Sequence, residues 1–457
     1  MTPDPQRLSV TLHGVRRMLE GVVPPTICTV CPDGMPHVAY LSIAEYVDPD
    51  HVALSWQFFN TSRQNVLATR RAALGIDDPY NGAGIALQLE YERTDTSGPI
   101  FERMRARLAG VASHAGMDGV FHLRGADIYR VLEIRRVPGR KDFPAAMPRC
   151  DVMAGARVVS ERLAACEDLG ELVDTAMCGL ADQLRIEHAM VWMLDKARGR
   201  MTLLASHGYD RSGIGAEIPL GVGVIGTCVR EAVPIRIGHM AGMTTYGRAV
   251  RERAAELGVA AVVHEEIPLP GLAAPRSQLA VPLRARGQVL GALFVESLHD
   301  QFFSYDDEDA LALLCAQLAG ALVTLPTAEP AADPAPAATR ALGATSGRDA
   351  PPLRIRRYPQ DDSVFLDDEY LIKGVAGAIL WKLARDFTST GRVDYSNREL
   401  RLAGQAIGLP DIQDNLEVRL LLLQRRLAER KSGIQIVKTG RGRFRLDVQR
   451  PLALAEA

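Results

Sequence analysis

A stretch of biased composition limits how this chain can fold. Residues 324–352 are rich in alanine and proline, with glycine, serine and threonine, and contain few large apolar side chains. Such a segment buries too little apolar surface to offset the entropy lost on ordering, so we expect a disordered tether. A chain of 457 residues also exceeds what one hydrophobic core usually organises. The sequence therefore predicts separate folded units on either side of residues 324–352.

The start of the chain and its hydropathy exclude membrane functions. Residues 1–10 lack a basic region followed by an apolar core, and no uninterrupted apolar run reaches membrane-spanning length. The seven cysteines are scattered, which is typical of reduced thiols. Cys28 and Cys31 have the spacing of a redox or metal pair, but residues three apart on a strand face opposite ways. We expect a cytoplasmic protein with structural cysteines and no metal site.

The most basic part of the chain lies near its C-terminal end. Residues 416–450 contain ten Lys and Arg residues against three acidic ones, whereas the whole chain has a net charge of −2. Leucines from Leu416 to Leu427 repeat at helical spacing, and Gly433 favours the end of that helix. Alternating apolar residues over 434–448 predict a hairpin. A local basic excess of this kind indicates a polyanionic partner.

Two further helices are predicted before this one. Leu371, Val375, Ile379 and Leu383 form one helical stripe, and no strand is evident ahead of it. Residues 396–399 have the pattern of a capping box that opens a second helix. A solvated surface on an ordinary small domain remains the alternative explanation for the basic residues.

Three helices closed by a basic hairpin resemble the OmpR/PhoB-type winged helix. In that family the third helix enters the DNA major groove and the hairpin contacts the backbone. The resemblance implies a winged-helix domain over residues 353–450 with DNA as its partner. The implied DNA-contacting residues are Arg419, Gln424, Arg426, Arg430, Lys438, Arg441 and Arg443.

The N-terminal part reads as a small β-domain over residues 1–145. Apolar, β-branched runs separated by turns such as Asp33-Gly34 suggest a compact barrel with helical insertions. The predicted strands are 22–30, 37–43, 51–59, 72–76 and 85–93, and the predicted helices are 62–69 and 98–115.

This order, with Trp56-Gln-Phe-Phe-Asn-Thr-Ser-Arg-Gln-Asn65 before a short helix, resembles the pyridoxamine-5′-phosphate-oxidase-like split barrel. Members of that family commonly bind FMN at a dimer interface. Hydroxyls and a guanidinium at a helix N-terminus suit an anion, so the resemblance implies a flavin-phosphate site. Its candidate residues are Trp56, Asn60, Thr61, Ser62 and Arg63. The alternative is a barrel that has lost its cofactor and serves in dimerisation or small-molecule binding.

Residues 155–323 alternate helices and strands around a glycine-rich segment. The stretches Ala205–Tyr209, Pro219–Gly226, Ala280–Leu283 and Leu290–Phe294 resemble a GAF domain. That resemblance implies an α/β sensor fold that binds a small molecule or dimerises. Its glycines are architectural, because the chain has no P-loop lysine or dinucleotide-binding fingerprint here.

The sequence thus predicts a multidomain α+β protein with a split β-barrel, a GAF α/β sensor domain and, after a disordered linker, a winged-helix domain. We interpret it as a homodimeric one-component transcriptional regulator that senses a small molecule or redox cofactor, with FMN as the candidate cofactor. Two alternatives stay open. One is an FMN-dependent oxidoreductase with regulatory appendages, although no residue set for substrate oxidation is evident. The other is a protein-binding signalling adaptor.

Overall fold

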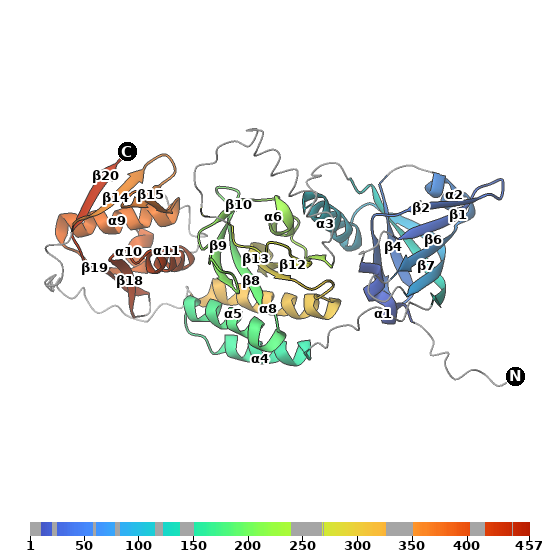
Figure 1. Ribbon diagram of the computed structural model, residues 1–457, viewed down its shortest axis with the longest axis horizontal. Coiled ribbons are helices and arrows are strands. Elements are labelled where there is room, and N and C mark those ends of the chain that lie inside the picture. The colour runs from blue at the N-terminus through green and yellow to red at the C-terminus, as the bar shows by residue number, and fades with distance from the viewer. Residues whose placement is uncertain are drawn as a thin grey trace.

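The computed structural model describes residues 11–20, 25–57, 61–77, 83–114, 122–137, 150–238, 267, 269–325, 351–402, 416–440 and 442–457. They form three lobes in a row (Figure 1). Each lobe is built on its own β-structure, and the lobe that begins near residue 150 lies in the middle. Almost all of the predicted tether lies outside the described residues. None of the described helices has the length and apolar character needed to cross a membrane.

The N-terminal lobe is a seven-stranded antiparallel sheet around its own apolar core. Its elements are α1 (Leu12–Val15), η1 (Arg16–Glu20), β1 (Thr26–Val30), β2 (Pro36–Tyr40), β3 (Ala44–Asp48), β4 (His51–Trp56), α2 (Thr61–Thr69), β5 (Arg71–Asp77), β6 (Gly84–Asp95), α3 (Pro99–His114) and β7 (Gly125–Val137). The strand order is β2-β1-β5-β6-β7-β4-β3. Every predicted strand and helix has a counterpart here. The sequence analysis missed β3 and β7, because charged residues interrupt their apolar ones.

The middle lobe is a six-stranded antiparallel sheet with helices on both faces. Its elements are α4 (Val152–Ala164), α5 (Leu169–Leu184), β8 (His188–Asp195), β9 (Arg200–His207), β10 (Glu217–Pro219), α6 (Gly223–Glu231), β11 (Ile235–Ile237), β12 (Ser277–Ala285), β13 (Gln288–Ser297) and α8 (Tyr305–Thr324). The strand order is β10-β9-β8-β13-β12-β11. Helices α4, α5 and α8 cover one face (Figure 1), and α6 packs on the other.

The first helical region of this lobe differs from the expectation. The amphipathic pattern of residues 158–185 predicts one long helix, but the structure has α4 and α5 with a break between them. Asp168 causes the new start, since its carboxylate accepts hydrogen bonds from the amides of Gly170 at 2.8 Å and Glu171 at 3.0 Å. An aspartate in this position satisfies amides that have no partner within the helix.

The C-terminal lobe combines two small sheets with three helices. Its elements are β14 (Leu353–Tyr358), β15 (Ser363–Leu366), β16 (Glu369–Ile372), α9 (Val375–Thr390), β17 (Asp394–Ser396), α10 (Asn397–Leu402), α11 (Leu416–Arg430), β18 (Ile434–Gly440), β19 (Arg443–Val448) and β20 (Leu452–Glu456). The sheets have the orders β16-β15-β14-β20 and β17-β19-β18, and β20 pairs in parallel with β14.

The start of this lobe corrects the sequence analysis. Three strands, β14 to β16, precede the helices, although no strand was expected there. Leu371 lies in β16 and not in the first helix, which begins at Val375 after Gly374 with its φ of +68°. The capping box at Ser396 is confirmed, because Ser396 N donates to Glu399 Oε2 at 3.0 Å and Glu399 N donates to Ser396 Oγ at 3.3 Å.

Candidate functional sites

The predicted flavin-phosphate residues meet other side chains inside the N-terminal lobe. Arg63 on α2 donates to the Asp127 carboxylate on β7 and, at 3.0 Å, to the Thr94 hydroxyl on β6. Thr94 in turn donates to Asp127 Oδ1 at 2.6 Å. The Arg63 guanidinium carbon also lies 3.7 Å from the ring centroid of Trp56. The cluster is nearly closed to solvent, since the Arg63 and Asp127 side chains are 10% and 8% exposed.

This arrangement does not fit a flavin phosphate at Arg63. An incoming phosphate would face the Asp127 carboxylate, and like charges at short range repel strongly in a buried site. The guanidinium also covers one face of the Trp56 ring. Of the remaining candidates, Thr61 is exposed, Ser62 is buried without a side-chain hydrogen bond, and Asn60 lies outside the described residues.

The sequence analysis missed the residues that close this cluster. Thr94 and Asp127 lie far along the chain from Arg63, and β6 and β7 bring them together. A signal existed at Asp127, a carboxylate inside the apolar part of a strand. Buried acids of this kind require a cation or several hydrogen-bond donors. The chemistry predicted its need for a partner but not which arginine would supply it.

A second polar cluster lies on the α6 face of the middle sheet. Glu296 is only 3% exposed. Its carboxylate accepts hydrogen bonds from the Leu272 amide at 2.7 Å and from Gln278 Nε2 at 3.2 Å. Burial raises the pKa of Glu296, and these neutral donors only partly offset that effect. Burial, and secondarily the Glu296 carboxylate, raises the pKa of the neighbouring Tyr209 hydroxyl.

A pocket of about 490 Å³ opens beside this cluster, at the end of the sheet where β8 begins and β13 ends. Its lining combines the Glu296 carboxylate and the imidazoles of His188 and His299 with the apolar Leu184 and Phe302. The long segment 241–276 is predicted to cover any ligand, and its residues 241–266 and 268 lie outside the described residues. Glu296 was not among the predicted site residues, because the residues before it have the pattern of an ordinary apolar strand.

The predicted DNA-contacting flank of α11 is mostly buried. The leucine stripe is confirmed as core, but Arg419 and Arg426 are only 7% and 5% exposed. Arg419 pairs with the Asp195 carboxylate of the middle lobe at 3.2 Å. Arg426 donates to the Leu371 carbonyl at 3.0 Å and to Glu429 at 2.8 Å, and burial lowers its pKa. In this structure Arg419 and Arg426 are therefore not open to DNA, in contrast to the prediction.

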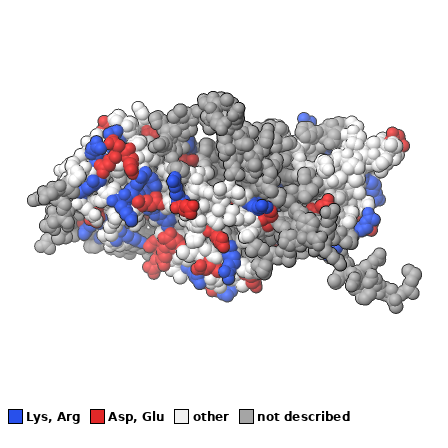
Figure 2. Space-filling view, in the orientation of Figure 1, with Lys and Arg blue, Asp and Glu red and all other residues white. Residues whose placement is uncertain are grey.

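Four of the other predicted contacts are exposed. Gln424 and Arg443 lie on the surface, and Lys438 pairs with Asp168 at 3.1 Å while its side chain stays 52% exposed. Arg430 donates to the Glu369 carboxylate and, at 2.9 Å, to the Tyr370 carbonyl. Arg441 lies outside the described residues. Basic and acidic residues are mixed over the C-terminal lobe and the adjoining part of the middle lobe (Figure 2), because many of these cations have carboxylate partners.

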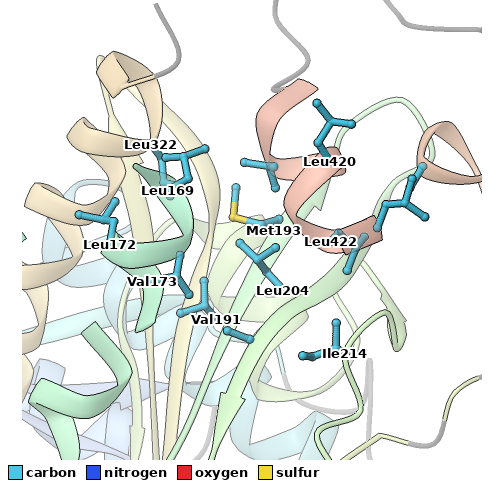
Figure 3. Close-up of a cluster of buried hydrophobic side chains, with 14 of the residues drawn as sticks. Leu169, Leu172, Val173, Val191, Met193, Leu204, Ile214, Leu322, Leu420 and Leu422 are labelled. Carbon is cyan, nitrogen blue, oxygen red and sulfur yellow. The ribbon is translucent and has the colours of Figure 1, made fainter. Parts of the chain in front are cut away.

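The side of α11 opposite its leucine stripe packs against the middle lobe. Leu422 lies on the side of α11 that faces the β8–β9 hairpin (Figure 3), where the helix contacts β9 and α5. The buried apolar residues of the two lobes form one continuous cluster through this contact. Leu421 extends it, since a Cβ built on Gly170 would lie 3.5 Å from its Cδ1. The helix is thus a shared element of two domains.

Comparison with known families assigns the middle lobe. Residues 166–323 match the family model of the GAF domain. The middle lobe is a GAF domain. The match confirms that part of the sequence analysis and identifies α5 to α8 as elements of a sensor fold. No curated protein matches the chain.

Three solved structures illustrate what parts of this chain are similar to. The GAF domain from Acinetobacter phosphoenolpyruvate-protein phosphotransferase is 23% identical, and the match covers 39% of this chain and 96% of that one with a TM-score of 0.31. The Neisseria meningitidis free methionine-R-sulfoxide reductase is 18% identical, with 38% and 93% covered and a TM-score of 0.29. An FMN-binding protein from Syntrophomonas wolfei is 19% identical, with 27% and 83% covered and a TM-score of 0.24.

Proposed function

We propose that this protein is a one-component transcriptional regulator whose C-terminal lobe is a winged helix that binds DNA. The observation that carries the proposal is the order of elements in that lobe. A small sheet precedes three helices, and the third helix, α11, leads directly into the β18–β19 hairpin. In winged-helix proteins the third helix enters the major groove and the hairpin contacts phosphates.

Charge supports a polyanion at this hairpin. Lys438 and Arg443 lie on it with exposed side chains, and Lys431 precedes it. Phosphate contacts from Lys and Arg account for most non-specific affinity for DNA. The GAF domain supplies the sensory part of the proposal, with the Glu296 pocket as the candidate place for a small-molecule ligand.

In this proposal the N-terminal lobe is a scaffold that packs against the GAF domain. Its helix α3 packs against α6 of the GAF domain, where Arg105 and Glu231 pair at 2.7 Å. A second bridge joins Arg16 to Asp306 at 3.0 Å. FMN binding at the split barrel remains a prediction, and the Arg63–Asp127 cluster argues against a phosphate at that arginine. We therefore assign the lobe a scaffolding role beside α6 and no oxidase turnover.

DNA binding by the full chain tests the proposal. Duplexes selected from a random-sequence pool are titrated by fluorescence anisotropy over a range of salt concentrations. The plot of log K against log salt has a negative slope, and the Arg443→Ala variant is expected to make that slope less negative by about 0.9, because one phosphate contact is lost. Arg157→Ala removes an equal charge from the exposed helix α4 and should leave the slope unchanged. Equal slopes for the two variants would exclude the hairpin as a DNA contact.

A further inference from the structure

Three cations of α11 and the β18–β19 hairpin have carboxylate partners in the GAF domain. Arg419 pairs with Asp195 at 3.2 Å, Arg425 with Asp174 at 2.6 Å, and Lys438 with Asp168 at 3.1 Å. These three acids come from the end of β8, from α5 and from the residue that caps α5. They lie along one side of α11 and reach Lys438, near the tip of the hairpin. The GAF domain thus offers negative charge to both elements that DNA would use.

Apolar contacts hold the same surface in place. Leu422 of α11 is buried on the side of the helix that faces the β8–β9 hairpin (Figure 3). Arg425 also donates to the Leu204 carbonyl at 3.1 Å, and Ser212 donates to the Glu429 carboxylate. A major groove admits a helix only when one of its faces is open to the bases. The exposed residues of α11 that remain are Gln424, Ala428, Glu429 and Arg430, and Arg430 pairs with Glu369 of its own lobe.

We propose that the GAF domain inhibits DNA binding from within the chain, by docking on α11 and presenting carboxylates in place of DNA phosphates. This inference rests on the proposed function of the C-terminal lobe. The docked form is closed, and separation of the two lobes frees Arg419, Arg425 and Lys438. The apparent affinity for DNA is then the affinity of the open form multiplied by the fraction of molecules that are open.

The docked helix also touches the part of the GAF domain next to its ligand face. A Cβ on Gly215, in the loop between β9 and β10, would lie 2.9 Å from Ile267 Cδ1 and 3.3 Å from Arg426 Cδ. Ile267 packs with the apolar cluster that α6 covers. A change on the α6 face therefore has a short contact route to α11, which gives a sensed molecule a means to shift the docking equilibrium.

Gly170 provides a variant that separates the lobes without altering α11. A Cβ at this position would make an ordinary contact with Leu421 Cδ1 at 3.5 Å and would move Asp168 Oδ1, 3.2 Å away, by a few tenths of an ångström. Gly170→Gln adds atoms that must displace Leu421, whereas Gly170→Ala is the matched control that leaves it in place. A second, independent variant is Asp174→Lys, which repels Arg425. Glu161→Lys on α4 makes the same charge change at an exposed site and controls for it.

Two readouts on the full chain distinguish the possible results. Hydrogen exchange of the amides of 416–430 reports docking, and anisotropy with a labelled duplex of mixed sequence reports DNA affinity. We expect Gly170→Gln and Asp174→Lys to accelerate exchange in that segment and to tighten DNA binding about tenfold over their controls, equivalent to ~1.4 kcal/mol. Reversal of the Asp174→Lys exchange effect by Arg425→Glu would assign it to this pair.

Two results would overturn the inference. Exchange that stays at control level in both variants means that these contacts do not hold α11. Faster exchange with DNA affinity equal to the controls means that docking is not inhibitory. If neither the wild type nor the undocked variants bind DNA, the proposed function itself fails, and docking then has another purpose.

Discussion

Two buried arginine–carboxylate pairs in this molecule look alike and differ in what they join. The Arg63 and Asp127 side chains are 10% and 8% exposed, and those of Arg419 and Asp195 are 9% and 7% exposed. The first pair links α2 to β7 within one lobe. The second links α11 to the end of β8, in two different lobes. Burial is the same, so the difference lies in how much structure must open to expose the charges.

That difference decides which arginine can bind a ligand. Releasing Arg63 requires α2 to move away from β7 inside one folded lobe, because Asp127 lies on an interior strand of the same sheet. Arg419 is released when two folded lobes separate along one surface. Both residues were predicted to contact an external ligand, Arg63 the phosphate of a flavin and Arg419 DNA. Only the pair between lobes can alternate between its carboxylate and an external anion.

The largest expected effect comes from the pair within one lobe. Arg63→Ala should lower the free energy of unfolding of the N-terminal lobe by about 3–5 kcal/mol, because Asp127 is left buried without its cation. Urea denaturation followed by circular dichroism measures the change. Arg71→Ala, which removes a 60% exposed partner of Glu90, should cost about 0–1 kcal/mol. Equal losses for the two variants would remove the basis for a structural Arg63 and reopen the flavin-phosphate assignment.

Glu296 extends the comparison to a buried carboxylate that accepts hydrogen bonds from uncharged donors, the Leu272 amide and the Gln278 side chain. Its pKa in the folded protein is raised by burial, so the folded state holds a proton that the unfolded state has released. Stability conferred by the protonated form is therefore present below the usual glutamate pKa and is lost as pH rises toward the raised value. Within that window each pH unit changes the unfolding free energy by about 1.4 kcal/mol.

Glu296→Gln should remove this pH dependence and raise stability at neutral pH relative to the wild type. Thermal denaturation of both proteins from acidic to neutral pH checks the prediction, with Glu161→Gln as the exposed control. Wild-type and variant curves that stay parallel over this range would mean that Glu296 keeps an ordinary pKa.

The smallest effect is expected for the pair at the rim of the docked surface. Arg425 is 15% exposed but Asp174 is 71% exposed, so solvent screens their attraction. A double-mutant cycle with Arg425→Ala and Asp174→Ala, read by hydrogen exchange in α11, should give a coupling of about 0.2–1 kcal/mol that falls with added salt. A coupling above that range would make this pair, and not the apolar contact, the main restraint on α11.

Much of the secondary structure follows from local pattern. The strands β4, β5 and β6 and the helix α2 were predictable, because apolar alternation and turn residues act over a few positions. The capping box at Ser396 was readable for the same reason. The helical break before Leu169 and the strands β14 to β16 were missed, since an aspartate cap inside a helical pattern and charged strand residues make weak local signals.

The candidate sites followed the sequence only in part. The sequence by itself determined that Arg63 and Arg419 would need an anion and that a helix with the leucine stripe of α11 would bury one face. It did not determine which anion, because Asp127 and Asp195 reach these arginines only through long-range packing. Tertiary structure decided that both arginines are satisfied by the protein's own carboxylates, and that α11 packs on the GAF domain through its second face. The local sequence shows that a buried charged side chain needs a partner of opposite charge, but only the folded structure determines which residue is that partner.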